Sequence, residues 1–91
     1  MKTEALLTLL EDAVEKLQIK LDYDDLRKDV VNTHGGLFTL HGERHALVHN
    51  DLSAREKAEV ILEILSKIDT EGVHLPPEVR KRLDAYKKLD G

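Results

Sequence analysis

Residues 34–49, HGGLFTLHGERHALVH, constrain the fold more than any other segment, because they have the pattern of a β-hairpin. Apolar and polar side chains alternate on both sides of Gly42 and Glu43, as expected for two half-buried strands. A glycine in the first position of a two-residue turn suits the twist of paired strands. We therefore predict a turn at Gly42 and Glu43, with His41 paired to Arg44. The fold must then contain a sheet.

The predicted pairing divides the hairpin side chains between two faces, because successive strand residues point to opposite sides. His41 would be separated from His45 and His49. One face would carry Phe38, Leu40, His45, Leu47 and His49, and the other would carry Leu37, Thr39, His41, Arg44, Ala46 and Val48.

The histidines of this segment are candidate ligands for a zinc-type metal ion, since imidazole nitrogens bind such ions readily. His45 and His49 lie about 13 Å apart along a strand, whereas zinc needs its nitrogens within about 2 Å, so these two cannot chelate one ion alone. A three-residue loop, 42–44, would instead pair His41 with His45 and put His41, His45 and His49 on one face, with His34 as a further candidate. The length of the turn therefore decides whether a metal site can form. The simplest interpretation is that these histidines are polar positions on a partly exposed sheet, and a pH-sensing role for buried histidines is another alternative.

Apolar residues at intervals of three and four predict a first helix that Thr3 caps and that continues through Leu17. After Gln18 the pattern changes to strict alternation, which predicts a strand over residues 19–23. Residues 24–32 have helical spacing over a shorter stretch and predict a short helix against the core.

Two start signals predict helices after the hairpin. Ser53 and Glu56 form a capping-box pattern, in which each side chain bonds to the backbone amide of the other residue. Pro77 suits the first turn of a last helix, because its missing amide hydrogen has no partner there in any case. Each helix has a single apolar stripe, so we predict an α+β fold in which a small antiparallel sheet, one strand plus the hairpin, packs against about three helices. Residues 1–91 would form one compact domain.

Composition restricts the compartment and the partners. The chain has no cysteine, which excludes disulfides and thiolate chemistry and fits a reducing compartment, so we expect a cytoplasmic protein. No apolar run approaches the roughly 20 residues that cross a bilayer, so we expect no membrane association. With 14 Lys and Arg against 18 Asp and Glu, the net charge of −4 argues against nucleic acid as a partner. A local contact through Arg80, Lys81 and Lys88 is the weaker alternative.

Catalytic motifs are missing from the sequence. No nucleophile elbow, phosphate-binding loop or EF-hand order of ligands is present, and Ser53 is explained by helix capping. We therefore expect a protein that is not an enzyme and that needs no cofactor.

The order of a helix, a short strand, a glycine-led hairpin that ends in Val48, His49 and Asn50, and then a capped apolar helix resembles the N-terminal half of compact bacterial zinc peptidases of the ImmA/IrrE group. The resemblance covers about residues 3–68. It sets Leu62, Glu63 and Ser66 where that family has the first His, the Glu and the second His of HExxH, so only Glu63 is kept. Without the two zinc-ligating histidines, it implies at most a catalytically dead relative.

Two hypotheses for function follow. The first is a non-catalytic protein-interaction or regulatory module that binds a protein partner or forms a homodimer through a sheet edge, because exposed edges pair readily with other chains. The alternative is a metal-binding protein that uses His41, His45 and His49.

Overall fold

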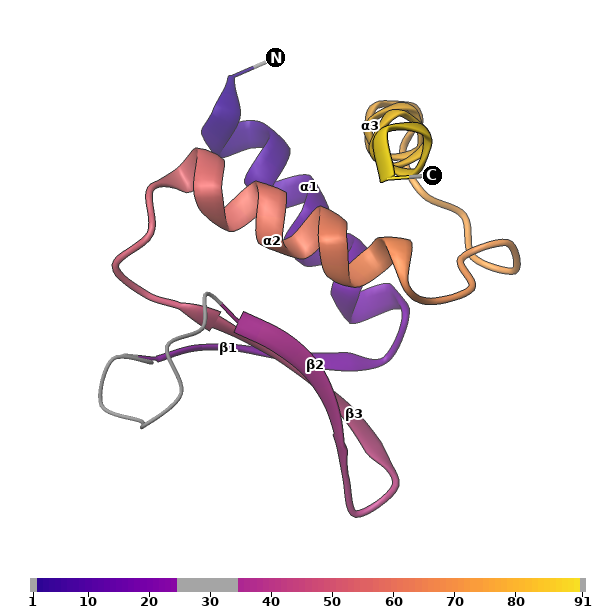
Figure 1. The fold of residues 1–91 in the computed structure, drawn as a ribbon. Helices are drawn as coiled ribbons and strands as arrows, with labels where there is room; N and C mark the ends of the chain where they lie inside the picture. The colour runs from indigo at the N-terminus through magenta and orange to yellow at the C-terminus, as the bar shows by residue number, and fades with distance from the viewer. Residues whose placement is uncertain (1, 25–34, 91) are drawn as a thin grey trace.

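The structure is a computed structural model that describes residues 2–24 and 35–90. Its described part contains three helices and three strands, which confirms the α+β class. All the helices lie on one side of the sheet, and the turn end of the hairpin extends beyond them (Figure 1). The elements are α1 (Thr3–Lys16), β1 (Ile19–Asp24), β2 (Gly35–Leu40), β3 (Glu43–His49), α2 (Ala54–Ser66) and α3 (Pro77–Asp90).

The helix starts agree with local sequence signals in two of three cases. The capping box before α2 is confirmed: the Glu56 amide donates to Ser53 Oγ at 3.2 Å, and the Ser53 amide donates to Glu56 Oε1 at 3.1 Å. Pro77 begins α3 as predicted. The prediction that Thr3 caps α1 is wrong. Lys2, which has an extended backbone, is the residue before the helix, and Thr3 is the first helical residue. Lys2 makes no side-chain capping bond.

The sheet is mixed, with strand order β1-β3-β2. The hairpin strands β2 and β3 are antiparallel, as predicted, but β1 pairs parallel to β3. The prediction of an antiparallel sheet is therefore wrong for β1. The reason is that β3, rather than β2, lies beside β1. β2 runs opposite to β3, and β3 runs the same way as β1.

The hairpin turn consists of His41 and Gly42, because Leu40 pairs with Glu43. The predicted turn at Gly42 and Glu43 is therefore wrong by one position. Backbone φ is 52° at His41 and 78° at Gly42, and two successive positive values are the signature of a type I′ turn. Glycine occupies the second turn position, where it adopts the left-handed conformation without a steric cost.

The predicted division of the strand residues between two faces is nevertheless confirmed. Moving the turn by one residue changes each partner by two positions, and a shift of two keeps every side chain on its face. Phe38 now pairs with His45, and Leu37 pairs with Ala46. His41 is the exception, since it lies in the turn and belongs to neither face.

The core lies between the helices and the inner face of the sheet. Ala46 and Val48 of β3 are buried there together with Ile19 of β1. α1 and α2 pack on each other and on the sheet, whereas α3 packs on α1 and α2 (Figure 1). The largest fully buried side chains are aliphatic apart from Thr70: Leu10, Ile61, Leu65, Leu83, Val14, Val48 and Val79.

Two predictions concern residues that lie wholly or mostly outside the described ranges. The short helix expected over residues 24–32 lies outside the described residues except for Asp24, which ends β1, and His34 is also outside them. Over residues 2–24 and 35–90, no helix has both the length and the apolar character needed to cross a membrane.

Candidate protein-interaction surface

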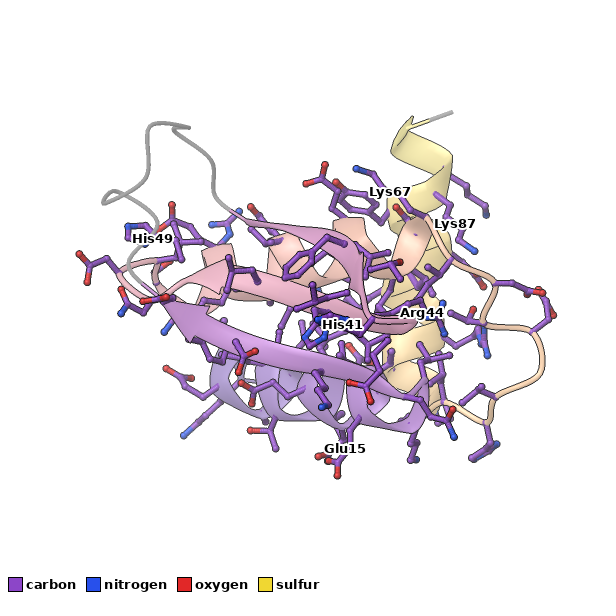
Figure 2. All side chains as sticks on the ribbon, turned by 90° about the horizontal axis from the view of Figure 1, so that it is seen from below. Glu15, His41, Arg44, His49, Lys67 and Lys87 are labelled. Carbon is purple, nitrogen blue, oxygen red and sulfur yellow. The ribbon has the colours of Figure 1, made fainter. Side chains whose placement is uncertain are left out.

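The face of the sheet that points away from the helices is the outer face, and it is seen from the front in Figure 2. The strand pairing determines which residues share this face. Lys20 of β1 lies on one side of His45 of β3, and Phe38 of β2 lies on the other side. The outer face is formed by Lys20, Asp22 and Asp24 of β1, Glu43, His45, Leu47 and His49 of β3, and Gly36, Phe38 and Leu40 of β2.

Phe38 and Leu40 are exposed at the β2 side of the outer face, with 45% and 48% of their area accessible. They are the large hydrophobic side chains that are exposed in the described part of the chain. The Phe38 ring stacks on the His45 ring, with centroids 5.3 Å apart and an interplanar angle of 10°. The Phe38 ring is therefore in contact with His45 and still exposed to water. An apolar pair held on an edge strand is a feature of interaction surfaces.

Charges gather at the opposite side of the outer face. Lys20 Nζ lies 2.9 Å from Glu43 Oε2, and His45 Nε2 lies 4.0 Å from the same oxygen. The hydrogen bond and the charge of Glu43 raise the pKa of Lys20, and the same bond to Lys20 lowers the pKa of Glu43. The outer face is therefore charged toward β1 and apolar toward β2.

The two edge strands differ in the same way. β1, IKLDYD, contains Lys20, Asp22 and Asp24, whereas β2, GGLFTL, contains no charged residue and no proline. Charged residues and proline on an edge are the usual protection against pairing with another chain. In the described part of the structure, no strand pairs with the outer side of β2. Among residues 2–24 and 35–90, therefore, no strand covers the β2 edge, and β2 itself has no charged side chain or proline to protect it.

The position of the turn determines which backbone amides and carbonyls of β2 point away from β3. The pair that closes a two-residue turn is hydrogen-bonded, and bonded pairs then alternate along the hairpin. With Leu40 and Glu43 as the closing pair, Phe38 and Gly36 also face β3. The amides and carbonyls of Leu37 and Thr39 consequently point away from β3, where they are available to a further strand.

The candidate metal ligands do not come together. His41 is exposed in the turn, while His45 is half-buried on the outer face. His49 is 8% exposed at the far end of β3, with Nδ1 3.3 Å from the Asp24 carbonyl oxygen. In Figure 2, the His49 label lies at the left end of the sheet, well apart from the His41 label. No group of three or more His, Asp or Glu side chains in the described residues is placed to hold a metal ion. The metal site stays a prediction.

Arg80, a candidate for nucleic-acid contact, is engaged within the fold. Its guanidinium donates to Thr70 Oγ1 at 2.7 Å, to the Thr70 carbonyl at 3.1 Å and to the Val73 carbonyl at 3.0 Å. These bonds hold the segment between α2 and α3. Sequence reasoning missed this role because no local pattern links Arg80 to a loop that precedes its helix. Lys81 and Lys88 are exposed on α3.

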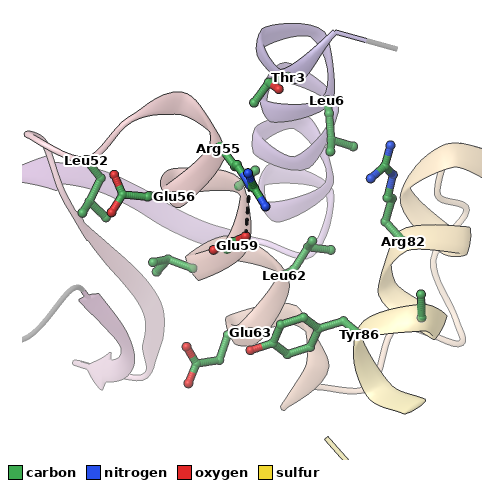
Figure 3. A pocket seen from close by; sticks show the side chains of 13 residues that line it. Thr3, Leu6, Leu52, Arg55, Glu56, Glu59, Leu62, Glu63, Arg82 and Tyr86 are labelled. Atoms are coloured by element: carbon green, nitrogen blue, oxygen red, sulfur yellow. Dashed lines mark ion pairs between the residues drawn. The ribbon is translucent and has the colours of Figure 1, made fainter. Parts of the chain in front are cut away.

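A groove of about 780 Å³ lies between the N-terminal part of α1, α2 and α3 (Figure 3). Leu6, Leu62 and Tyr86 provide apolar surface in the groove. On its α2 wall, Arg55 forms an ion pair with Glu59 at 3.5 Å. Acidic and basic side chains both line it, so the groove does not select a ligand of one charge. Sequence reasoning did not anticipate it, because three separate elements form it.

Comparisons with protein-family models, curated proteins and solved structures find no match to this chain. The resemblance to the ImmA/IrrE peptidases therefore stays a prediction. In the structure, Leu62 faces the core, whereas Glu63 is exposed on α2 and lies 3.5 Å from Lys67 Nζ in an ion pair.

Proposed function

We propose that this chain is a non-catalytic protein-interaction module that binds an extended polypeptide segment as a further strand on β2. The observation that carries the proposal is an open edge strand with two exposed apolar side chains, Phe38 and Leu40, and no charge. The cysteine-free composition supports a reducing compartment, and we place the module in the cytoplasm.

Strand addition uses the main chain for affinity and alternate side chains for specificity. On β2, the outward amides and carbonyls of Leu37 and Thr39 would bond to the added segment. Phe38 and Leu40 would contact its apolar side chains on the outer face. Glu43 lies on β3 and Lys20 on β1, both on the far side of β2 from the added segment, so their charges are not directly opposite an apolar segment.

The test compares two variants at Thr39 in binding to extended peptides selected from a displayed peptide library. Thr39→Pro removes an outward amide and leaves the bonds from β2 to β3 in place, since proline is tolerated on the solvent side of an edge strand. Thr39→Val keeps the amide and the branched shape. We expect Thr39→Val to bind the selected peptides as the unmodified protein does, and Thr39→Pro to bind them about tenfold or more weakly.

Urea unfolding of both variants shows whether each remains folded. Equal peptide binding by a folded Thr39→Pro and by Thr39→Val would reject strand addition at β2. Failure to select any peptide that prefers the unmodified protein over Thr39→Pro would reject it as well.

A further inference from the structure

We infer that the segment added to β2 is β2 of a second copy of this chain, antiparallel and related by a two-fold axis that passes beside Phe38. The inference rests on the proposed function, because it names the partner of the same edge. The two sheets would join into one continuous sheet across the axis.

Backbone geometry allows this register. An axis at Phe38 sets Leu37 opposite Thr39 of the second copy, and both residues have outward amides and carbonyls that can bond to each other. Phe38 then lies opposite its own equivalent, at a non-bonded position where Cα atoms approach to about 4.5 Å. Residues 36–40 are all paired with residues 36–40 of the other copy.

The side chains are self-complementary in the same register. Leu40 lies opposite Gly36 of the second copy. Gly36 is exposed, and a Cβ atom added there would meet no other atom within 4 Å, so the space beside it is open to a leucine side chain. The two Phe38 rings meet at the axis. The His45–Phe38 stack therefore extends into a row of rings that crosses both sheets on the outer face.

Neighbouring registers are less favourable. An axis at Leu37 sets Phe38 opposite Gly36 and moves Leu40 beyond the end of the second β2 strand, so Leu40 has no partner within that strand. An axis at Thr39 pairs only residues 38–40 within the two strands. The axis at Phe38 covers both exposed apolar side chains.

The charge distribution favours a second copy at β2 over one at β1. A two-fold axis at Asp22 of β1 would set Asp22 opposite Asp22, and like charges directly opposite each other destabilise a strand pair. β2 contains no charged residue, so pairing it with itself has no such penalty. The net charge of −4 on each copy acts over longer distances and is screened by salt.

The first test is the oligomeric state of the unmodified protein by light scattering over a concentration series. We expect a dimer for the unmodified protein and for Thr39→Val, and a monomer for Thr39→Pro. A strict monomer at every concentration overturns the inference. If that monomer still binds selected peptides in the Thr39-dependent manner described above, the proposed function stands and only the second copy is rejected.

The second test determines the register by cysteine cross-linking, which is clean because the chain has no cysteine of its own. Gly36→Cys and Leu40→Cys proteins are oxidised separately and as an equal mixture. In the inferred register the two thiols lie at opposed positions with Cα atoms about 4.5 Å apart, within the range of a disulfide. Two copies of the same variant place their thiols about 13 Å apart, because four strand residues separate the positions.

We therefore expect a disulfide-linked dimer from the mixture and little from either variant alone. Both variants keep Phe38, so the centre of the interface is unchanged. Equal cross-linking in the three samples, or a dimer by light scattering without cross-linking in the mixture, overturns this register.

Discussion

Tyr23 shows how one residue links the sheet to the helical layer. Its hydroxyl donates to Glu11 Oε2 of α1 at 2.5 Å, and Lys57 Nζ of α2 lies 5.0 Å from the centre of its ring. Burial raises the pKa of the Tyr23 phenol, and the hydrogen bond to Glu11 raises it further. The alternation of Ile19, Leu21 and Tyr23 predicted that this side chain faces the core, which is confirmed. The Glu11 contact depends on how α1 crosses the sheet.

We expect Tyr23→Phe to lower the free energy of unfolding at neutral pH by about 1 kcal/mol, through loss of the bond to Glu11. The pKa of Tyr23 is higher in the folded state than the value of about 10 in the unfolded state. Its contribution is therefore complete below pH 10 and is lost as the pH rises above 10. Urea unfolding at several pH values should show the two proteins converging above about pH 10. A constant difference across that range would contradict the prediction.

The alternation of apolar and polar residues predicts the hairpin strands and the face to which each side chain points. It does not predict the position of the turn. A Gly-first turn at Gly42 and Glu43 and a turn at His41 and Gly42 both contain two residues and both keep the same faces. The backbone of His41, at φ 52°, shows that the structure has the second arrangement. The hairpin sequence by itself does not distinguish the two arrangements, because both satisfy the same alternation of apolar and polar side chains.

Two substitutions in the turn should change the free energy of unfolding in opposite directions. His41→Asn should raise the free energy of unfolding by about 0.5 kcal/mol, because asparagine tolerates the left-handed backbone better than histidine does. Gly42→Ala should lower it by about 1–2 kcal/mol, and this cost is conformational because nothing lies within 4 Å of an added Cβ. Urea denaturation measures both. With the turn at Gly42 and Glu43, His41 would be a strand residue and His41→Asn would destabilise the protein.

For the whole molecule, the core and the proposed interaction surface use separate apolar residues. Leu10 of α1 is 0% exposed in the core, while Leu40 is 48% exposed on the outer face. We expect Leu10→Ala to lower the free energy of unfolding by about 2–5 kcal/mol, a large part of the stability of a domain of this size. Leu40→Ala should change it by less than about 0.5 kcal/mol in dilute, monomeric protein.

The same pair of variants separates folding from association. Light scattering should show that Leu40→Ala dimerises more weakly than the unmodified protein, although its unfolding curve is unchanged. A Leu40→Ala protein that unfolds as easily as Leu10→Ala would mean that Leu40 belongs to the core, and the surface described above would be wrong.

The amino-acid sequence by itself determined the features that depend on neighbours along the chain. The helix stripes, the capping box of Ser53 and Glu56, the α+β class and the two faces of the hairpin all follow from short-range spacing. Only the tertiary structure decided that β3 lies between β1 and β2, that the sheet is mixed, and that Arg80 holds the loop at Thr70. These features depend on which distant surfaces bury each other, and each strand pattern is compatible with several partners.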